Sequence, residues 1–276
     1  MSKRKMIQGH FCCGLPYNCF GKGSRVIVIF QGLLFENKPL TGLPAFFMTR
    51  IYMFLNKEYR IYIVTRKPGL PEGYSMGNMA EDYAEMIREE FDAPVDVIGV
   101  STGGSIAQHF AADYPDLVRR LVLHSSAFAL NDKAKRAQLR IGHLARRRRW
   151  REAYFTLMSL SFPERGLMKY LSAPFLWLVS LLGGSMDAPE DPTDLVVTIE
   201  AEDKHDFKDR LSEIAVPTLV IAGDKDPFYS ETLFRETAEG IPKAELILYE
   251  GMGHPASGKR FNRDVLAFLK EGVVSI

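Results

Sequence analysis

Six short runs of apolar residues recur along the chain and are separated by amphipathic segments. Each run is nearly continuous rather than alternating with polar positions, which is typical of strands buried on both faces of a parallel sheet. The runs are RVIVIF (25–30), RIYIVT (60–65), VDVIGV (95–100), RLVLHS (120–125), TLVIAG (218–223) and ELILYE (245–250). They predict six strands of one sheet.

The segments between these runs have helical spacing. In residues 78–91, apolar side chains recur every three or four positions, and Asn78 followed by Glu81 predicts a capping box at the helix start. Further helices are predicted over residues 101–115, 226–242 and 261–272. Strands that alternate with helices predict the α/β class, with a mostly parallel central sheet flanked by helices.

The alternation stops between residues 129 and 210. This stretch has helical patterns and turn clusters but no β-rich run before DLVVTIE (194–200), which fits either a strand or a helix. We therefore predict that residues 1–128 and 211–276 form one core domain and that residues 129–210 are a helical cap inserted into it.

The composition fits this plan. The chain has 276 residues, 46% of them hydrophobic and 25% charged, which is enough for one large domain with an insertion. A net charge of +1 gives no reason to expect nucleic acid as a partner. The N-terminal segment lacks the continuous apolar core of a signal peptide, and the longest apolar stretch, 171–182, is too short to span a bilayer. We expect a cytoplasmic protein.

The cysteines and the charges of the cap add little chemistry. Cys12, Cys13 and Cys19 are odd in number and lack a second Cys/His cluster, so free thiols are expected. Residues 133–151 carry nine Lys or Arg and no acid, whereas residues 187–209 carry nine acids and two Lys. We interpret these segments as two solvated faces; contact of the basic one with a membrane surface or an acidic partner is the alternative.

The stretch GVSTGG (99–104) lies where a predicted strand passes into a predicted helix. It fits the pattern G-x-S-x-G, which raises a serine above the carboxyl edge of a sheet. The helix N-terminus beside it favours a developing oxyanion. Ser101 is therefore a candidate nucleophile.

A serine nucleophile needs a base and a group that orients the base. His254, in GMGHP directly after the last predicted strand, is preferred; His124, at the end of another strand, is the rival. His254 also follows an acid candidate in the chain order Ser, Asp, His. Asp224 and Asp226 both follow a strand, and spacing alone does not choose between them.

The order of VIVIFQG, GVSTGG, GDKDPF and GMGHP resembles that of the α/β-hydrolase superfamily over most of the chain. The resemblance implies Ser101 as nucleophile and His254 as base. It implies Asp226 as the acid, because the family's acid commonly ends a G-x-x-D turn. The variable cap of that family corresponds to residues 129–210.

The same resemblance implies an oxyanion hole made by the amides of Thr102 and Leu33. Gln31 stands where the family often has histidine, so it either holds the loop or contacts a polar group of the substrate. Arg66 corresponds to a structural arginine. No metal ligands and no phosphate-binding loop are evident, so no cofactor and no metal are expected.

These residues predict a serine hydrolase of the carboxylesterase type, EC 3.1.1, that acts on an ester, thioester or lactone of a small, fairly apolar molecule. Three alternatives stay open: hydrolysis of a carbon–carbon bond beside a ketone, a receptor-like member with slow turnover, and a peripheral lipase that uses the basic cap. The sequence does not indicate an oligomeric state.

Overall fold

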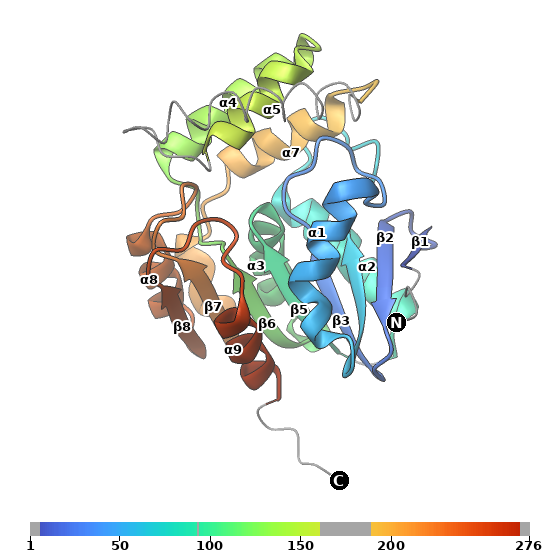
Figure 1. Ribbon diagram of the computed structural model, residues 1–276, viewed down its shortest axis with the longest axis vertical. Coiled ribbons are helices and arrows are strands. Elements are labelled where there is room, and N and C mark those ends of the chain that lie inside the picture. The colour runs from blue at the N-terminus through green and yellow to red at the C-terminus, as the bar shows by residue number, and fades with distance from the viewer. Residues whose placement is uncertain (1–5, 93, 161–188, 271–276) are drawn as a thin grey trace.

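The computed structural model describes residues 6–92, 94–160 and 189–270, in which one twisted sheet carries helices on both faces (Figure 1). The strand order is β1-β2-β4-β3-β5-β6-β7-β8, and all neighbours from β4 to β8 are parallel. The strands are β1 Ile7–His10, β2 Pro16–Gly21, β3 Arg25–Phe30, β4 Tyr59–Val64, β5 Val95–Val100, β6 Val118–His124, β7 Thr218–Gly223 and β8 Ala244–Tyr249.

All six predicted strands are present, within two residues of the predicted bounds, so the α/β class and the mostly parallel sheet are confirmed. The sequence analysis misses β1 and β2, which pair antiparallel at one edge. Their apolar residues are interrupted by polar ones such as Gln8 and Asn18, and β1 is largely exposed. An exposed edge strand such as β1 lacks the continuous apolar signal of the central strands. In β2 the break is a buried Asn18, whose side chain bonds the backbone of Leu40 on both sides, at 3.0 and 2.7 Å.

Helices occupy most of the remaining described residues. The α-helices are α1 Gly42–Tyr52, α2 Met76–Glu90, α3 Thr102–Asp113, α4 Asp132–Arg146, α5 Trp150–Leu160, α7 Thr193–Asp203, α8 Glu231–Gly240 and α9 Lys259–Lys270. Short 3-10 turns are η1 Met53–Leu55, η2 Pro115–Leu117 and η3 Lys208–Glu213. The four predicted helices correspond to α2, α3, α8 and α9, while α1 has no counterpart in the sequence analysis.

Two hydrophobic clusters lie on the two faces of the sheet. Val28 of β3 packs in the same cluster as Tyr83 of α2, whereas its neighbour Ile27 packs in the cluster of Tyr52 of α1 and Phe261 of α9. Successive residues of a strand point to opposite faces, so the continuous apolar runs are what a doubly covered sheet requires. In Figure 1, α1 and α9 cover one face and α2, α3 and α8 the other.

The start of α2 differs from the prediction. Ser75 is the N-cap: its Oγ accepts a hydrogen bond from the Asn78 amide at 3.1 Å, and the Asn78 side chain accepts one from the Ser75 amide at 3.1 Å. Asn78 is thus the last residue of the capping box and not its first, and the predicted pair with Glu81 is wrong. The helix starts earlier than predicted because Ser75 and Asn78 bond each other's backbone amides reciprocally.

Helices α4, α5 and α7 lie together beyond the carboxyl ends of the strands (Figure 1). They form a small apolar cluster that includes Ile141, Trp150 and Ile199. The ambiguous DLVVTIE segment is helical and belongs to α7. An ion pair between Arg146 of α4 and Glu200 of α7 joins the basic segment to the acidic one. This arrangement fits the predicted cap, although residues 161–188, with the apolar stretch 171–182, lie outside the described residues.

The three cysteines are free thiols. In the described ranges 6–92, 94–160 and 189–270, no helix is both long and apolar enough to cross a bilayer.

Three histidines are held neutral inside the fold. Burial lowers the pKa of His124 and of His205 to about 3. Burial and the charge of Arg210 lower the pKa of His109 to about 4. The unfolded chain, with pKa values near 6.5, binds protons at these sites first, so stability is present above pH 6.5 and is lost as the pH falls toward 4.

We predict that the free energy of unfolding falls below pH 6.5 and that His205→Leu makes this fall less steep. Both ring nitrogens of His205 lack a hydrogen-bond partner among the described residues, so the variant removes no hydrogen bond. Each buried histidine contributes up to about 1.4 kcal/mol per pH unit to the slope. Urea unfolding at several pH values between 7 and 5 measures this slope, the change in the free energy of unfolding per pH unit. His10→Gln, at an exposed site in β1, should keep the slope of the wild type, and an unchanged slope in His205→Leu would contradict the assignment.

Candidate active site

Ser101 lies at the turn between β5 and α3. All six residues of β5 are buried, and α3 begins at Thr102, so the chain reverses at Ser101. Its φ is 52° and its ψ is −126°, a conformation that L-residues rarely adopt and that costs about 1–3 kcal/mol. Ser101 does not cap the helix with its side chain, so its hydroxyl is available for other contacts.

The glycines around Ser101 permit a close approach of backbones. A Cβ atom at Gly103 would lie 2.0 Å from the carbonyl oxygen of Phe30, and one at Gly99 would lie 2.6 Å from the Cα atom of Gly104. Both contacts are impossible for any other residue without movement of the backbone. The glycines therefore let α3 start directly against β3 and β5.

Asp226 follows β7 and His254 follows β8, so these two parallel neighbouring strands bring both residues to the carboxyl edge of the sheet. His254 Nδ1 lies 2.7 Å from Asp226 Oδ2, and the other carboxylate oxygen of Asp226 accepts hydrogen bonds from the amides of Phe228 at 2.8 Å and Tyr229 at 3.2 Å. The Asp226 side chain is fully buried, and that of His254 is 11% exposed. The turn after β7 thus holds the carboxylate rigidly and directs one oxygen at the imidazole.

Asp224 has a different partner. Its Oδ1 accepts a hydrogen bond of 2.7 Å from the Gly251 amide, in the turn that precedes His254. It therefore stabilises the loop that carries the histidine, while Asp226 contacts the ring itself.

His124, the rival base, is fully buried and used on both sides. Tyr52 donates its hydroxyl proton to His124 Nδ1 at 2.8 Å, and His124 Nε2 donates to the Ala256 carbonyl at 2.6 Å. The carbonyl of His124 accepts from the Ser101 amide at 3.1 Å, and the Ala256 amide donates to Ser125 Oγ at 3.1 Å. His124 and Ser125 therefore join the Ser101 turn to the His254 loop, and no ring nitrogen of His124 is left to act as a base.

The loop after β3 is held by Arg66. The guanidinium of Arg66, 1% exposed, donates to the carbonyls of Gln31 at 3.0 Å and Gly32 at 3.1 Å. Leu33 follows these two residues directly, so this fixed loop determines where its amide lies. Gln31 is buried, and its side-chain oxygen has no hydrogen-bond partner among the described residues.

Buried polar groups that the sequence analysis does not identify surround the first turn of α3. Ser105 donates to Glu202 of α7 at 2.6 Å, and burial raises the pKa of that carboxyl. Tyr229, 1% exposed, interacts with the side chains of Ser126 and Ser101, yet its hydroxyl has no hydrogen bond of normal geometry. In the sequence, the one signal for Tyr229 is its position three residues after Asp226. Glu202 is one of several acids in residues 187–209, and nothing in the sequence distinguishes it from the others.

No group of three or more His, Cys, Asp or Glu side chains that could hold a metal ion occurs in the described part of the chain. The candidate residues are, in chain order, a hydroxyl, a carboxylate and an imidazole, beside a loop of fixed backbone. Tyr229 links them, because its side chain interacts with that of Ser101 and its ring centroid lies 6.2 Å from that of His254. That arrangement suits nucleophilic attack on a carbonyl carbon.

Residues 63–259 match the model of the alpha/beta hydrolase fold family. The chain belongs to this family. The α/β-hydrolase assignment confirms the resemblance on which the sequence interpretation rests, and it makes the protein a member of a family of hydrolytic enzymes.

Individual α/β-hydrolases similar to this chain differ in chemistry. A 2-hydroxy-6-oxononadienedioate/2-hydroxy-6-oxononatrienedioate hydrolase of a Pseudomonas species is 25% identical over 96% of this chain and 94% of its own length. A bifunctional esterase/perhydrolase of Acinetobacter calcoaceticus is 24% identical over 80% of this chain and 85% of its own. The structure of an enol-lactonase from Burkholderia xenovorans superposes with a TM-score of 0.76 at 19% identity, over 96% and 100% of the two chains, which shows the shared fold.

The two aspartates of the β7 turn provide a matched test. We predict that Asp226→Asn lowers the rate of labelling by a fluorophosphonate probe about 10³-fold or more. The neutral amide no longer holds the imidazole in the required tautomer and no longer stabilises its protonated form. Asp224→Asn should lower it less than about tenfold, because the asparagine oxygen still accepts from the Gly251 amide. Equal losses in the two variants, with both folded by circular dichroism, would mean that the acid is wrongly assigned.

Proposed function

We propose that the protein is a cofactor-independent serine hydrolase that cleaves a carboxylic ester or a related acyl bond, such as a thioester or lactone, of a small, fairly apolar substrate. The observation that carries this proposal is the 2.7 Å contact between His254 and Asp226, in a chain whose Ser101 is held at a φ of 52° after β5. Ser101, His254 and Asp226 act as nucleophile, base and orienting acid.

The hydrogen bond to Asp226 fixes the tautomer of His254. With the proton on Nδ1 directed at the carboxylate, Nε2 carries the free electron pair and takes the proton from the Ser101 hydroxyl as Oγ attacks the carbonyl carbon. The buried carboxylate then stabilises the imidazolium that results. This separation of roles requires that the His254 loop stay in place, which the contacts of Ala256 with His124 and Ser125 favour.

The amides of Thr102 and Leu33 stabilise the oxyanion of the tetrahedral intermediate. Thr102 is the first residue of α3, so its amide lies at the positive end of the helix dipole, and the Leu33 amide lies in the loop held by Arg66. One such donor is typically worth about 3 kcal/mol of transition-state stabilisation. His254 next protonates the leaving group, the acyl-enzyme forms, and water activated by the same imidazole releases the acid.

A second candidate is hydrolysis of a carbon–carbon bond beside a ketone. It is supported by the similarity, over nearly the whole chain, to the Pseudomonas 2-hydroxy-6-oxononadienedioate/2-hydroxy-6-oxononatrienedioate hydrolase. The Tyr229 hydroxyl, which has no hydrogen bond of normal geometry among the described residues, can donate to a keto oxygen, and the unpaired oxygens of Gln31 and Glu202 can accept the proton of an enol hydroxyl. The same triad serves either reaction, so the triad alone does not separate the two.

We predict that the wild type hydrolyses at least one class in a panel of short esters, thioesters, lactones and vinylogous 1,5-diketones, and that Ser101→Ala loses more than about 10³-fold in kcat/KM because no nucleophile remains. Chromatography of the products distinguishes acyl hydrolysis from carbon–carbon cleavage. Thr156→Ala, in α5, removes a hydroxyl that donates to the Glu152 carbonyl of its own helix and serves as the matched control.

The same proteins labelled with a fluorophosphonate probe separate a specific enzyme from a receptor-like member. Labelling of Ser101 together with turnover of a panel substrate is the expected result. A folded wild type that neither labels nor turns over any substrate would overturn the proposal.

A further inference from the structure

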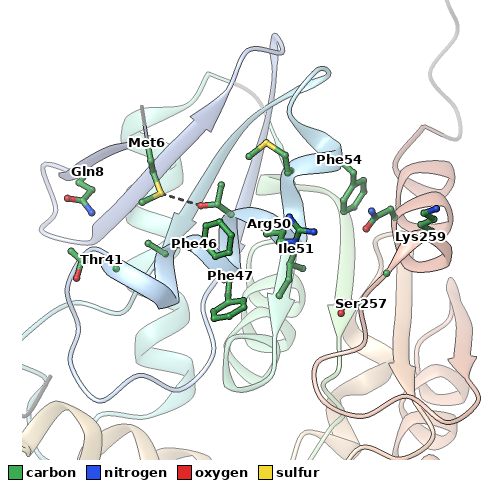
Figure 2. Close-up of a pocket in the computed structure, with 16 residues that line it drawn as sticks. Met6, Gln8, Thr41, Phe46, Phe47, Arg50, Ile51, Phe54, Ser257 and Lys259 are labelled. Atoms are coloured by element: carbon green, nitrogen blue, oxygen red, sulfur yellow. Dashed lines mark hydrogen bonds between the residues drawn. The ribbon is translucent and has the colours of Figure 1, made fainter. Parts of the chain in front are cut away.

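A groove of about 990 Å³ runs between α1 and the start of α9, on the face of the sheet that carries these two helices (Figure 2). Its walls include Met6 at the start of the described chain, Phe46 and Phe47 of α1, Phe54 of η1 and Lys259 of α9. The Thr49 hydroxyl contacts the Met6 sulfur at 3.4 Å, which holds the N-terminal segment against α1.

Exposed apolar side chains gather at this groove. Of the seven large hydrophobic residues that are exposed in the described chain, Phe46, Phe47 and Met53 line it, and Phe46 and Phe47 are each 57% exposed. Leu43, a fourth exposed residue, lies in the first turn of α1. Only Ala45 and Tyr52 of the eleven residues of α1 are buried. Most apolar side chains of this helix are therefore at least partly exposed to solvent. Contiguous apolar patches of this kind mark interaction surfaces.

The charge around the patch has one sign. The lining includes Arg50 and Lys259 and no acidic residue. Neither cation has an ion-pair partner among the described residues. Lys259 begins α9, whose first turn holds no acid, so a cation lies at the positive end of the helix dipole. An anion at this surface would interact favourably with the positive end of the α9 dipole and with both side-chain cations.

This charge distribution distinguishes between occupants. In a symmetric dimer of this chain, the same patch would face itself and bring Arg50 and Lys259 toward their own copies. A bilayer with anionic headgroups instead offers hydrocarbon for the aromatic side chains and negative charge for the cations.

We propose that the face formed by α1 and the start of α9 binds to membranes rich in anionic phospholipid, with Leu43, Phe46 and Phe47 inserted at the headgroup boundary and Arg50 and Lys259 on phosphate groups. This site is separate from the basic segment of the cap.

The location suggests a use for the contact, which rests on the proposed function. Thr41 at the start of α1 lines both this groove and a smaller pocket of about 80 Å³. The smaller pocket is lined by Leu34, Phe35 and Tyr154, beside the loop that carries Leu33. Membrane binding at α1 would bring lipid-dissolved apolar esters to the side of the protein where the oxyanion loop lies.

The test is co-sedimentation with sucrose-loaded vesicles at low salt. Wild type should bind vesicles of equal parts phosphatidylcholine and phosphatidylglycerol, bind less as salt rises, and bind pure phosphatidylcholine weakly. Phe46→Ala with Phe47→Ala should lower the partition coefficient tenfold or more, roughly what loss of two inserted aromatic rings predicts. Arg50→Gln and Lys259→Gln should each lower it about fivefold at low salt.

Two controls make the result decisive. Phe155→Ala, at an exposed ring of α5, and Arg147→Gln with Arg151→Gln, in the basic cap, should leave binding unchanged. Ser101→Ala should still bind, and the Phe46→Ala, Phe47→Ala variant should label with fluorophosphonate in solution as wild type does, so failure of the proposed function is seen separately.

Absence of wild-type binding at low salt would overturn the proposal. So would unchanged binding of the double phenylalanine variant, or loss of binding only in the cap variant. A dimer in light scattering that the phenylalanine substitutions dissociate would assign the face to a second copy of the chain and overturn it as well.

Discussion

The buried imidazole of His124 joins the parts on which the candidate site depends. Its backbone carbonyl binds the amide of Ser101, and its ring donates to the carbonyl of Ala256, two residues after His254. Of the contacts of His124, only the one in which Nδ1 accepts the Tyr52 hydroxyl proton depends on the neutral ring, because a protonated Nδ1 no longer accepts. The backbone carbonyl and the Nε2–H group hold together two loops that lie more than a hundred residues apart in sequence.

The two aspartates after β7 show a similar division between chemistry and support. Asp226 uses one oxygen on backbone amides and the other on His254, so the orientation of the imidazole follows from the path of the backbone. Asp224 closes the turn from which the histidine emerges. Arg66 does the same for the loop of Gln31 and Gly32. The His254 loop and the loop before Leu33 are thus each held by a polar side chain that contacts backbone.

The predictability of the structure from sequence follows the burial of each element. Strands such as β5, covered on both faces, are continuous in apolar character and were located nearly to the residue. The sequence does not reveal the edge strand β1 because it is largely exposed, nor β2 because a buried polar residue, Asn18, interrupts its apolar run. It does not reveal α1 because the apolar side chains of this helix face outward and give no amphipathic pattern.

The candidate site residues differ in how far the sequence alone identifies them. Motif order indicated Ser101 and His254, but the choice between Asp224 and Asp226 came from the family resemblance, since both follow the same strand. The side-chain contacts of His124 with Ala256, of Glu202 with Ser105 and of Tyr229 with Ser101 join elements distant in the chain, and no local pattern encodes them.

At Ser101, the positive φ lowers the stability of the fold, while the proposed function requires the serine hydroxyl at this position. Glycine at position 101 would relieve the backbone strain and also remove the hydroxyl. A library selected for thermal resistance alone would therefore enrich glycine there, while one selected for turnover of an acyl substrate would retain serine. Comparison of the residues found at position 101 in the two selections would show whether the serine costs the protein folding stability.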